Sequence, residues 1–222
     1  MTENQPPRKV QAPRVRQPER RPAARDEERR RRLVLYTIAA SGLAALAAVL
    51  IFLFATGGGT KDLTAALKEG GCTYETAKAQ EAKHVADDAK PKWKTDPPSS
   101  GPHFPETAPF DFYEEPVDTL RLVHNLEHGG VVVYYGDEVP EATVEKMRQW
   151  WADDPNGVVV SPYAKLGGSE IVLAAWTKRG STETAHLARC DGFDEKAFTG
   201  FRDELRAKGP EPFPLDALAP GS

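Results

Sequence analysis

The 222-residue sequence has few of the features that mark the common classes of enzyme and binding protein. It contains only two cysteines, Cys72 and Cys190, and no Cys-x-x-Cys pair, so a thioredoxin-like redox role has no support. It has no Gly-x-Ser-x-Gly motif, phosphate-binding loop or dinucleotide fingerprint, and therefore no recognisable site for a nucleotide cofactor. Glycine and proline follow no period and only one long apolar run is present, which excludes collagen-like, coiled-coil and polytopic membrane proteins.

A surplus of positive charge is found only at the N-terminus. Residues 1–32 carry 11 Lys and Arg against 5 Asp and Glu, whereas the rest of the chain carries 18 against 28. A nucleic-acid-binding domain needs a basic face, so the acidic remainder argues against a nucleic-acid partner. Residues 1–32 also hold five prolines and no aromatic residue, which predicts a disordered basic tail.

An uncharged run of 22 residues follows, from Leu33 to Phe54. In a helix that rises about 1.5 Å per residue, this run covers about 30 Å, the thickness of the hydrocarbon core of a bilayer. Arginines precede the run and glycines follow it, so the positive-inside rule predicts a cytoplasmic N-terminus and an extracytoplasmic domain at residues 55–222. A cleaved signal peptide is the alternative, but its apolar region normally spans only about 7–15 residues. We therefore predict a single-pass protein of the cell membrane, held in the lipid bilayer by residues 33–54.

Residues 55–222 alternate irregularly between helical and strand patterns, which favours an α+β fold. We expect one domain with a small central sheet and flanking helices, and a core at about residues 70–213. The periodicity predicts helices over 61–69, 141–153 and 193–208, and strands over 131–135, 158–160 and 171–176.

The other segments of this domain give weaker patterns. A helix is expected before Pro91 within the polar residues 75–96, and residues 212–222 are expected to be loose. The proline-rich residues 97–105 predict a stiff loop and not a strand, because proline fixes φ and removes a hydrogen-bond donor. Two histidines in polar stretches are predicted to be solvated and three tryptophans to be in the core: His84, His186, Trp150, Trp151 and Trp176.

Both cysteines lie outside the membrane in the predicted topology. An oxidising compartment and an even count favour a Cys72–Cys190 disulfide, which would tie the entry segment of the domain to the start of the last helix. Two free thiols are the alternative.

Residues with the capacity for chemistry gather in two motifs, one containing His103 and the other running from His124 to Gly130. His124-x-x-Glu127-His128 has the form of an inverted zinc-protease motif. On a helix the two histidines would lie about 6 Å apart on one face, but on a strand they would be roughly 13 Å apart, too far for one ion. A shared metal therefore requires that residues 124–128 form a helix or a turn. Because a predicted strand begins at residue 131, this segment is short, which fits poorly with the long helix of a zinc protease.

The same motifs resemble a bacterial family known as domain of unknown function 3105. The resemblance rests mainly on the Pro-Pro-Ser-Ser-Gly-Pro-His segment ending at His103 and on the segment from His124 to Tyr135. Shorter matches, at residues 161–163, 174–176 and 209–211, extend it over about residues 70–213. Asp111 and Thr177 stand where we would expect glycine. The resemblance implies a membrane-anchored or exported domain, but it implies no activity.

Three hypotheses follow for the motifs. In the first, His103, His124 and His128, with Glu127 in or beside the ligand set, bind zinc or copper, since imidazole suits both ions. In the second, the domain is a metal-dependent hydrolase with Glu127 as its general base. In the third, the domain is structural or binds a partner, and its histidines join the loop to the core without metal.

Overall fold

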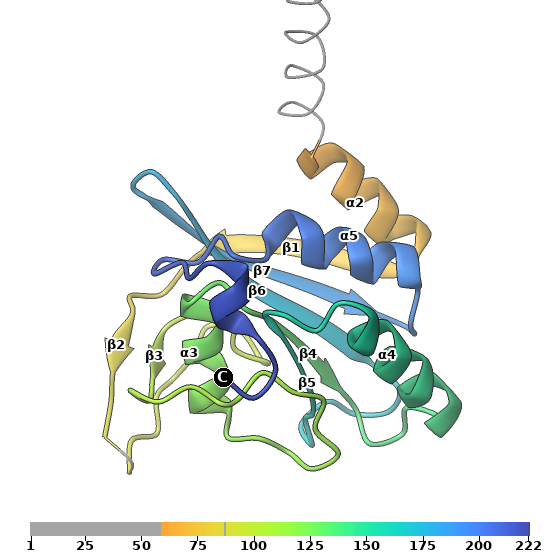
Figure 1. Cartoon of the computed structure of the whole chain (residues 1–222), viewed down its shortest axis with the longest axis horizontal. Coiled ribbons are helices and arrows are strands. Elements are labelled where there is room, and N and C mark those ends of the chain that lie inside the picture. Colours follow the sequence, from red (N-terminus) through yellow and green to blue (C-terminus); the bar gives the residue numbers. More distant parts are fainter. Residues whose placement is uncertain (1–58, 87) are drawn as a thin grey trace, which may run out of the picture. The chain divides into compact units, whose positions relative to one another are not determined.

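A five-stranded mixed sheet organises the part of the chain that this computed structural model describes, residues 59–86 and 88–222 (Figure 1). Its order is β1-β7-β6-β4-β5, and only β4 and β5 are parallel. With four α-helices around it, the sheet confirms the predicted α+β class. The strands are β1 (Cys72–Lys78), β4 (Val131–Tyr135), β5 (Val158–Pro162), β6 (Ile171–Arg179) and β7 (Thr182–Cys190).

The predictions for the N-terminal tail, residues 1–32, and for the transmembrane helix, residues 33–54, lie outside the described residues. Within residues 59–86 and 88–222, none of the helices combines the length and the apolar character needed to span a bilayer.

Three helices cover one face of the sheet: α2 (Gly59–Glu69), α4 (Glu141–Asp153) and α5 (Glu195–Leu205). Alternate side chains of β4 point to this face, namely Val131, Val133 and Tyr135, and pack with the apolar sides of the helices. Helix α4 connects the parallel strands β4 and β5, a connection that cannot be made by a tight turn. We refer to this side of the sheet as the three-helix face.

The opposite face is covered by α3 (Thr119–Glu127), by the proline-rich loop and by a short 3-10 helix, η1 (Leu215–Leu218). Val132 and Tyr134 of β4 point to this side, as the two-residue period of a strand requires. A parallel pair of two-residue strands, β2 (Lys83–His84) and β3 (Pro102–His103), lies beside α3 (Figure 1). We refer to this side as the loop face.

The predicted disulfide is confirmed. Cys72 begins β1, Cys190 ends β7, and the two residues are direct partners in the antiparallel register. The bond therefore closes the end of the edge-strand pair and spans 118 residues of sequence.

Several predictions for the weaker segments were wrong. The helix expected within residues 75–96 is replaced by the strands β1 and β2, and β7 was not foreseen. Strand β1 is an edge strand with mostly exposed side chains, so pairing with β7, and not local hydrophobic pattern, determines its conformation. The loop at 97–105 contains the short strand β3. The tail is also ordered, because Leu218 is buried and its carbonyl accepts a 2.6 Å hydrogen bond from the Gly157 N–H.

The tryptophan prediction holds for Trp150 and Trp176, which are buried. Trp151 is only partly buried, although its indole N–H donates to the carbonyl of Val158. It therefore lies at the edge of the core on the three-helix face.

Candidate metal centre

Helix α3 and its C-terminal cap supply three of the predicted ligands. The Asp118 carboxylate caps the helix by accepting from the Leu120 N–H. The helix ends at Glu127, His128 is its C-terminal cap, and Gly129 then adopts a φ of +89°. His124 and Glu127 are one turn apart, so they share a side of the helix. The helical geometry that a shared metal requires is thus present in a helix of nine residues.

A buried amide fixes the proline-rich loop against α3. Asn125 is fully buried, and its side chain both accepts from the Ala108 N–H, at 3.0 Å, and donates to the Ala108 carbonyl, at 2.8 Å. The Phe104 N–H also donates to the carbonyl of Leu120. These contacts hold the loop in one register beside the helix, and that register brings His103 to Glu127.

His103 is fully buried and faces Glu127. Its Nδ1 lies 2.8 Å from the Gly101 carbonyl oxygen, and because that oxygen can only accept, Nδ1 must carry a proton. Its Nε2 lies 3.0 Å from Oε2 of Glu127, a carboxylate that is also buried. A hydrogen bond from one ring nitrogen to a backbone carbonyl is the usual way in which a protein orients a metal-binding histidine.

A fourth side chain, His84, joins this cluster. Its ring centroid lies 5.1 Å from that of His103 and 5.2 Å from that of His124. One potential ligand atom from each of His84, His103, His124 and Glu127 falls within 4.8 Å of all the others. We call these four residues the inner set. His84 is exposed, as predicted, but its place beside the other ligands was missed. The sequence around His84 contains no signal for this position, because His84 reaches the inner set only through the pairing of β2 with β3.

The predicted ligand His128 lies at the edge of the inner set. Its Nε2 is 3.1 Å from Nε2 of His124, and its ring lies 4.4 Å from that of Phe213. Together with Glu127 and Glu211 it forms a second group of ligand atoms within 4.8 Å of one another, which we call the outer set. The structure therefore brings all four predicted residues together, but divides them between two overlapping sets.

The pKa values of His124, His128 and Glu127 are shifted in the directions that favour binding of a cation. Burial, reinforced by the charges of His128 and His103, lowers the pKa of His124 to about 4, and burial likewise lowers the pKa of His128. Burial acts to raise the pKa of Glu127, but the contact with His103 and the nearby histidines outweigh it and lower that pKa. At neutral pH His124 and His128 are therefore neutral beside an ionised Glu127, which is the protonation state that metal ligands need.

Two buried ring nitrogens in the cluster have no hydrogen-bond partner among the described residues, namely Nε2 of His103 and Nδ1 of His124. Buried polar atoms nearly always find a partner, so two such atoms in one cluster call for an explanation. Nδ1 of His103 donates to the Gly101 carbonyl, and its Nε2 lies 3.0 Å from a carboxylate oxygen of Glu127. Two such atoms repel unless a proton or a metal ion lies between them.

Comparison with known families identifies the chain. Residues 84–213 match the model of a family described as "Protein of unknown function (DUF3105)". This match covers more than half of the chain. The chain belongs to the DUF3105 family. Comparison with curated proteins and with solved structures gave no match.

The DUF3105 match begins at His84 and ends at Phe213. The first of these residues contributes to the inner set, and the ring of the second packs against His128. The matched region thus contains every residue of both ligand sets.

His186 has a different environment from the one predicted. It is buried, and its ring bridges two hydroxyl groups: Nδ1 lies 2.7 Å from the Tyr74 hydroxyl and Nε2 lies 2.7 Å from that of Thr177. Its predicted exposure was wrong, because β7 places it between β1 and β6. Both of its nitrogens have partners, so it has the contacts of a structural histidine.

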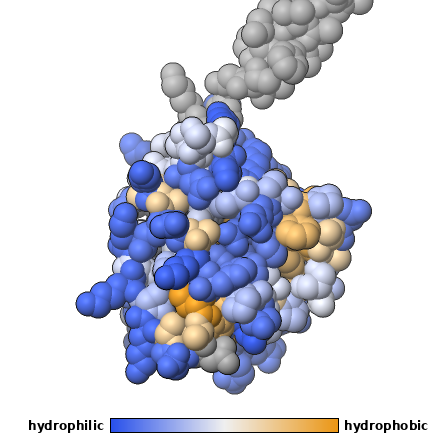
Figure 2. Space-filling view, turned by 90° about the vertical axis from the view of Figure 1, so that its left-hand side faces the viewer, coloured by the Kyte–Doolittle hydropathy of each residue, from blue (hydrophilic) through white to orange (hydrophobic). Residues whose placement is uncertain are grey.

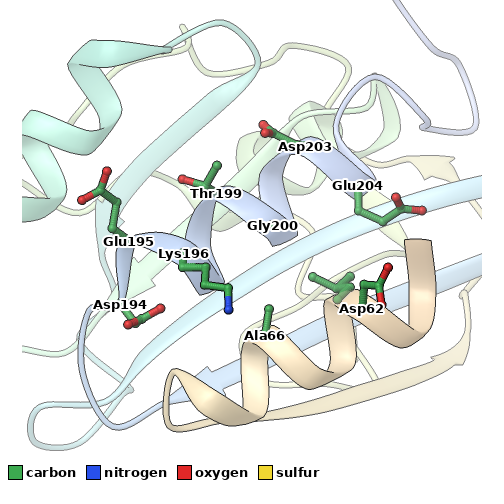
Figure 3. Close-up of a pocket in the computed structure, with 10 residues that line it drawn as sticks. Asp62, Ala66, Asp194, Glu195, Lys196, Thr199, Gly200, Asp203 and Glu204 are labelled. Atoms are coloured by element: carbon green, nitrogen blue, oxygen red, sulfur yellow. The ribbon is translucent and has the colours of Figure 1, made fainter. Parts of the chain in front are cut away.

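A groove with a volume of about 870 Å³ lies between α2 and α5, away from the cluster (Figure 3). Its lining is rich in carboxylates, including Asp62, Asp203 and Glu204, and none of the cluster residues contributes to it. The side of the molecule seen in Figure 2 is mostly hydrophilic, with small separate apolar areas.

Proposed function

We propose that this DUF3105 protein is a membrane-anchored extracytoplasmic domain that binds a transition metal ion, zinc or copper, through the inner set. His103, His124 and Glu127 would be the buried ligands, and His84 would complete the site from its exposed side. Imidazole nitrogens with one carboxylate oxygen are a donor set that both metals accept.

The single observation that carries this proposal is the arrangement of His103 and Glu127. The Gly101 carbonyl accepts from Nδ1 of His103 and so orients the ring, and Nε2 faces Oε2 of Glu127 at 3.0 Å. Ligands about 2.0–2.1 Å from a tetrahedral zinc ion lie roughly 3.3 Å from one another. The recorded separation, and the 3.8 Å between Nε2 of His124 and Oε2 of Glu127, suit ligands that share an ion.

The two other hypotheses receive less support. In the hydrolase hypothesis Glu127 must be free to act as a base, but its carboxylate lies within the ligand set, in contact with His103. In the structural hypothesis a proton would join His103 to Glu127, which accounts for this pair but not for the approach of His84 and His124 to the same carboxylate.

Metal binding is tested on the purified full-length protein after metal has been removed. Zinc and copper are titrated separately by calorimetry, and bound metal is measured by mass spectrometry of the dialysed sample. We expect wild type to bind at least one ion per chain, and His103→Gln to weaken binding by about tenfold or more, because it removes a buried ligand.

The matched control is His186→Gln, which alters a buried histidine whose ring nitrogens are both occupied. It should bind metal as wild type does. Metal binding by wild type no stronger than that of His103→Gln, with both proteins folded by circular dichroism, would contradict the proposal.

The membrane anchor is tested independently. We expect the intact protein to remain in carbonate-washed membranes, and external protease to leave only a short N-terminal fragment. Recovery of a soluble mature form that begins near Gly57 would instead identify a cleaved signal peptide.

A further inference from the structure

The outer set adjoins the inner set and shares Glu127 with it. We infer that a second divalent cation binds between Glu127, His128 and Glu211, so that the carboxylate of Glu127 bridges two ions. This inference rests on the proposed function, because the bridge requires an ion in the inner set.

Glu127 has the geometry of a bridging ligand. It is buried, and both of its ion-pair contacts within the described residues, to His103 and His124, use Oε2. In the inferred bridge, Oε1 is the oxygen that binds the second cation. Paired metal ions in proteins lie about 3.5–4 Å apart, a spacing that one carboxylate can bridge.

His128 occupies the boundary between the two ions. Its Nε2 lies 3.1 Å from that of His124, so the inner and outer sets are neighbours and not separate sites. The second cation explains why a residue in the predicted motif is absent from the inner set: His128 binds the neighbouring ion. One imidazole and two carboxylates form a mixed donor set that suits zinc and other divalent transition ions.

Glu211 is held at the site by the segment 207–213, which we call the C-terminal strap. The Glu211 N–H donates to the Glu127 carbonyl at 3.1 Å, and the Phe213 N–H donates to that of His128 at 3.3 Å. These bonds fix the register of the strap along the end of α3. The carboxylate of Glu211 thus reaches the outer set although the residue itself is exposed.

Close packing of the backbone makes this register specific. A Cβ on Gly209 would lie 2.2 Å from the carbonyl oxygen of Glu127, so only glycine permits the approach. The Ala207 N–H adds a 2.7 Å hydrogen bond to the Gly129 carbonyl. The strap is therefore anchored on both sides of the residue that carries the second carboxylate.

The experiment counts bound ions. Metal-free full-length protein is dialysed against increasing free zinc, and bound zinc per chain is measured by mass spectrometry. We expect two ions for wild type and one for Glu211→Gln, with affinity for the second ion lowered about tenfold or more. His128→Gln should give the same result as Glu211→Gln.

The control is Asp216→Asn, which removes another exposed carboxylate from the same end of the chain and should still bind two ions. One ion for wild type, unchanged in Glu211→Gln, overturns the second position and leaves the proposed function intact. Two ions in both proteins also overturn it, because the second ion then lies elsewhere. No zinc bound by wild type overturns both proposals.

Discussion

Buried histidines on the two faces of the sheet differ in whether their ring nitrogens have hydrogen-bond partners. On the three-helix side, His186 is bonded through both ring nitrogens to protein hydroxyls. On the loop face, His103 and His124 each keep a buried nitrogen without a hydrogen bond among the described residues, beside a buried carboxylate. Burial alone therefore does not indicate a metal ligand, since all three side chains are buried. What distinguishes His103 and His124 is a ring nitrogen directed at the buried carboxylate of Glu127.

The largest effect should come from the disulfide, which belongs to the three-helix face. In the chain-entropy model, opening a closed loop of this length costs about 4–5 kcal/mol. Cys72→Ala/Cys190→Ala should therefore lower the free energy of unfolding by about that amount, measured by urea denaturation. If the two faces are independent, the folded variant should keep wild-type zinc stoichiometry. Loss of zinc binding in a folded variant would show that the faces are coupled.

Zinc should stabilise the protein through the loop face only. A ligand present at about 1,000 times its dissociation constant stabilises the folded state by roughly 4 kcal/mol. We expect zinc to raise the denaturation midpoint of wild type and of His186→Gln equally, and that of His103→Gln by less, since each tenfold loss of affinity removes about 1.4 kcal/mol of this stabilisation. Equal zinc-induced shifts in all three proteins would remove the distinction between the two kinds of buried histidine.

Acid should destabilise the protein partly through His186. Burial lowers the pKa of His186 to about 4, whereas an unfolded histidine has a pKa near 6.5. Between these values only the unfolded state takes up the proton, so stability falls as the pH drops from about 6.5 to about 4 and changes no further below that. At about 1.4 kcal/mol per pKa unit, the loss is on the order of 3 kcal/mol.

This effect is measured as the difference in unfolding free energy between wild type and His186→Gln, across that pH range and with a metal chelator present. The variant should lose less stability than wild type. Parallel pH curves for the two proteins would mean that His186 does not titrate as its burial requires.

The smallest of these effects should follow from releasing the loop. Asn125→Ala removes both hydrogen bonds to Ala108 and leaves buried backbone groups without partners, at a cost of about 2 kcal/mol. Because the same contacts hold the loop that carries His103, zinc affinity should fall as well, by calorimetry. Unchanged zinc affinity in the destabilised variant would show that the hydrogen bonds between Asn125 and Ala108 are not needed to position His103 for zinc binding.

Much of the core was predictable because its signals are local. The run of β-branched and aromatic residues at 131–135 and the helical stripe at 141–153 appear as predicted, and the helix predicted over 193–208 is present as α5. The disulfide was predictable for a different reason, since only two cysteines are present. The prediction failed for β1, β2 and β7, where pairing with a distant strand determines the conformation.

The amino-acid sequence alone establishes which residue types are available for chemistry. It also establishes the spacing of His124, Glu127 and His128, which makes them neighbours once the segment is helical. Tertiary contacts, in contrast, bring His84 to these residues, place His186 elsewhere, and deliver Glu211 from the C-terminal strap. These residues are distant in sequence and are brought together by strand pairing and backbone hydrogen bonds. A local pattern cannot encode such contacts, because their geometry exists only after the chain has folded.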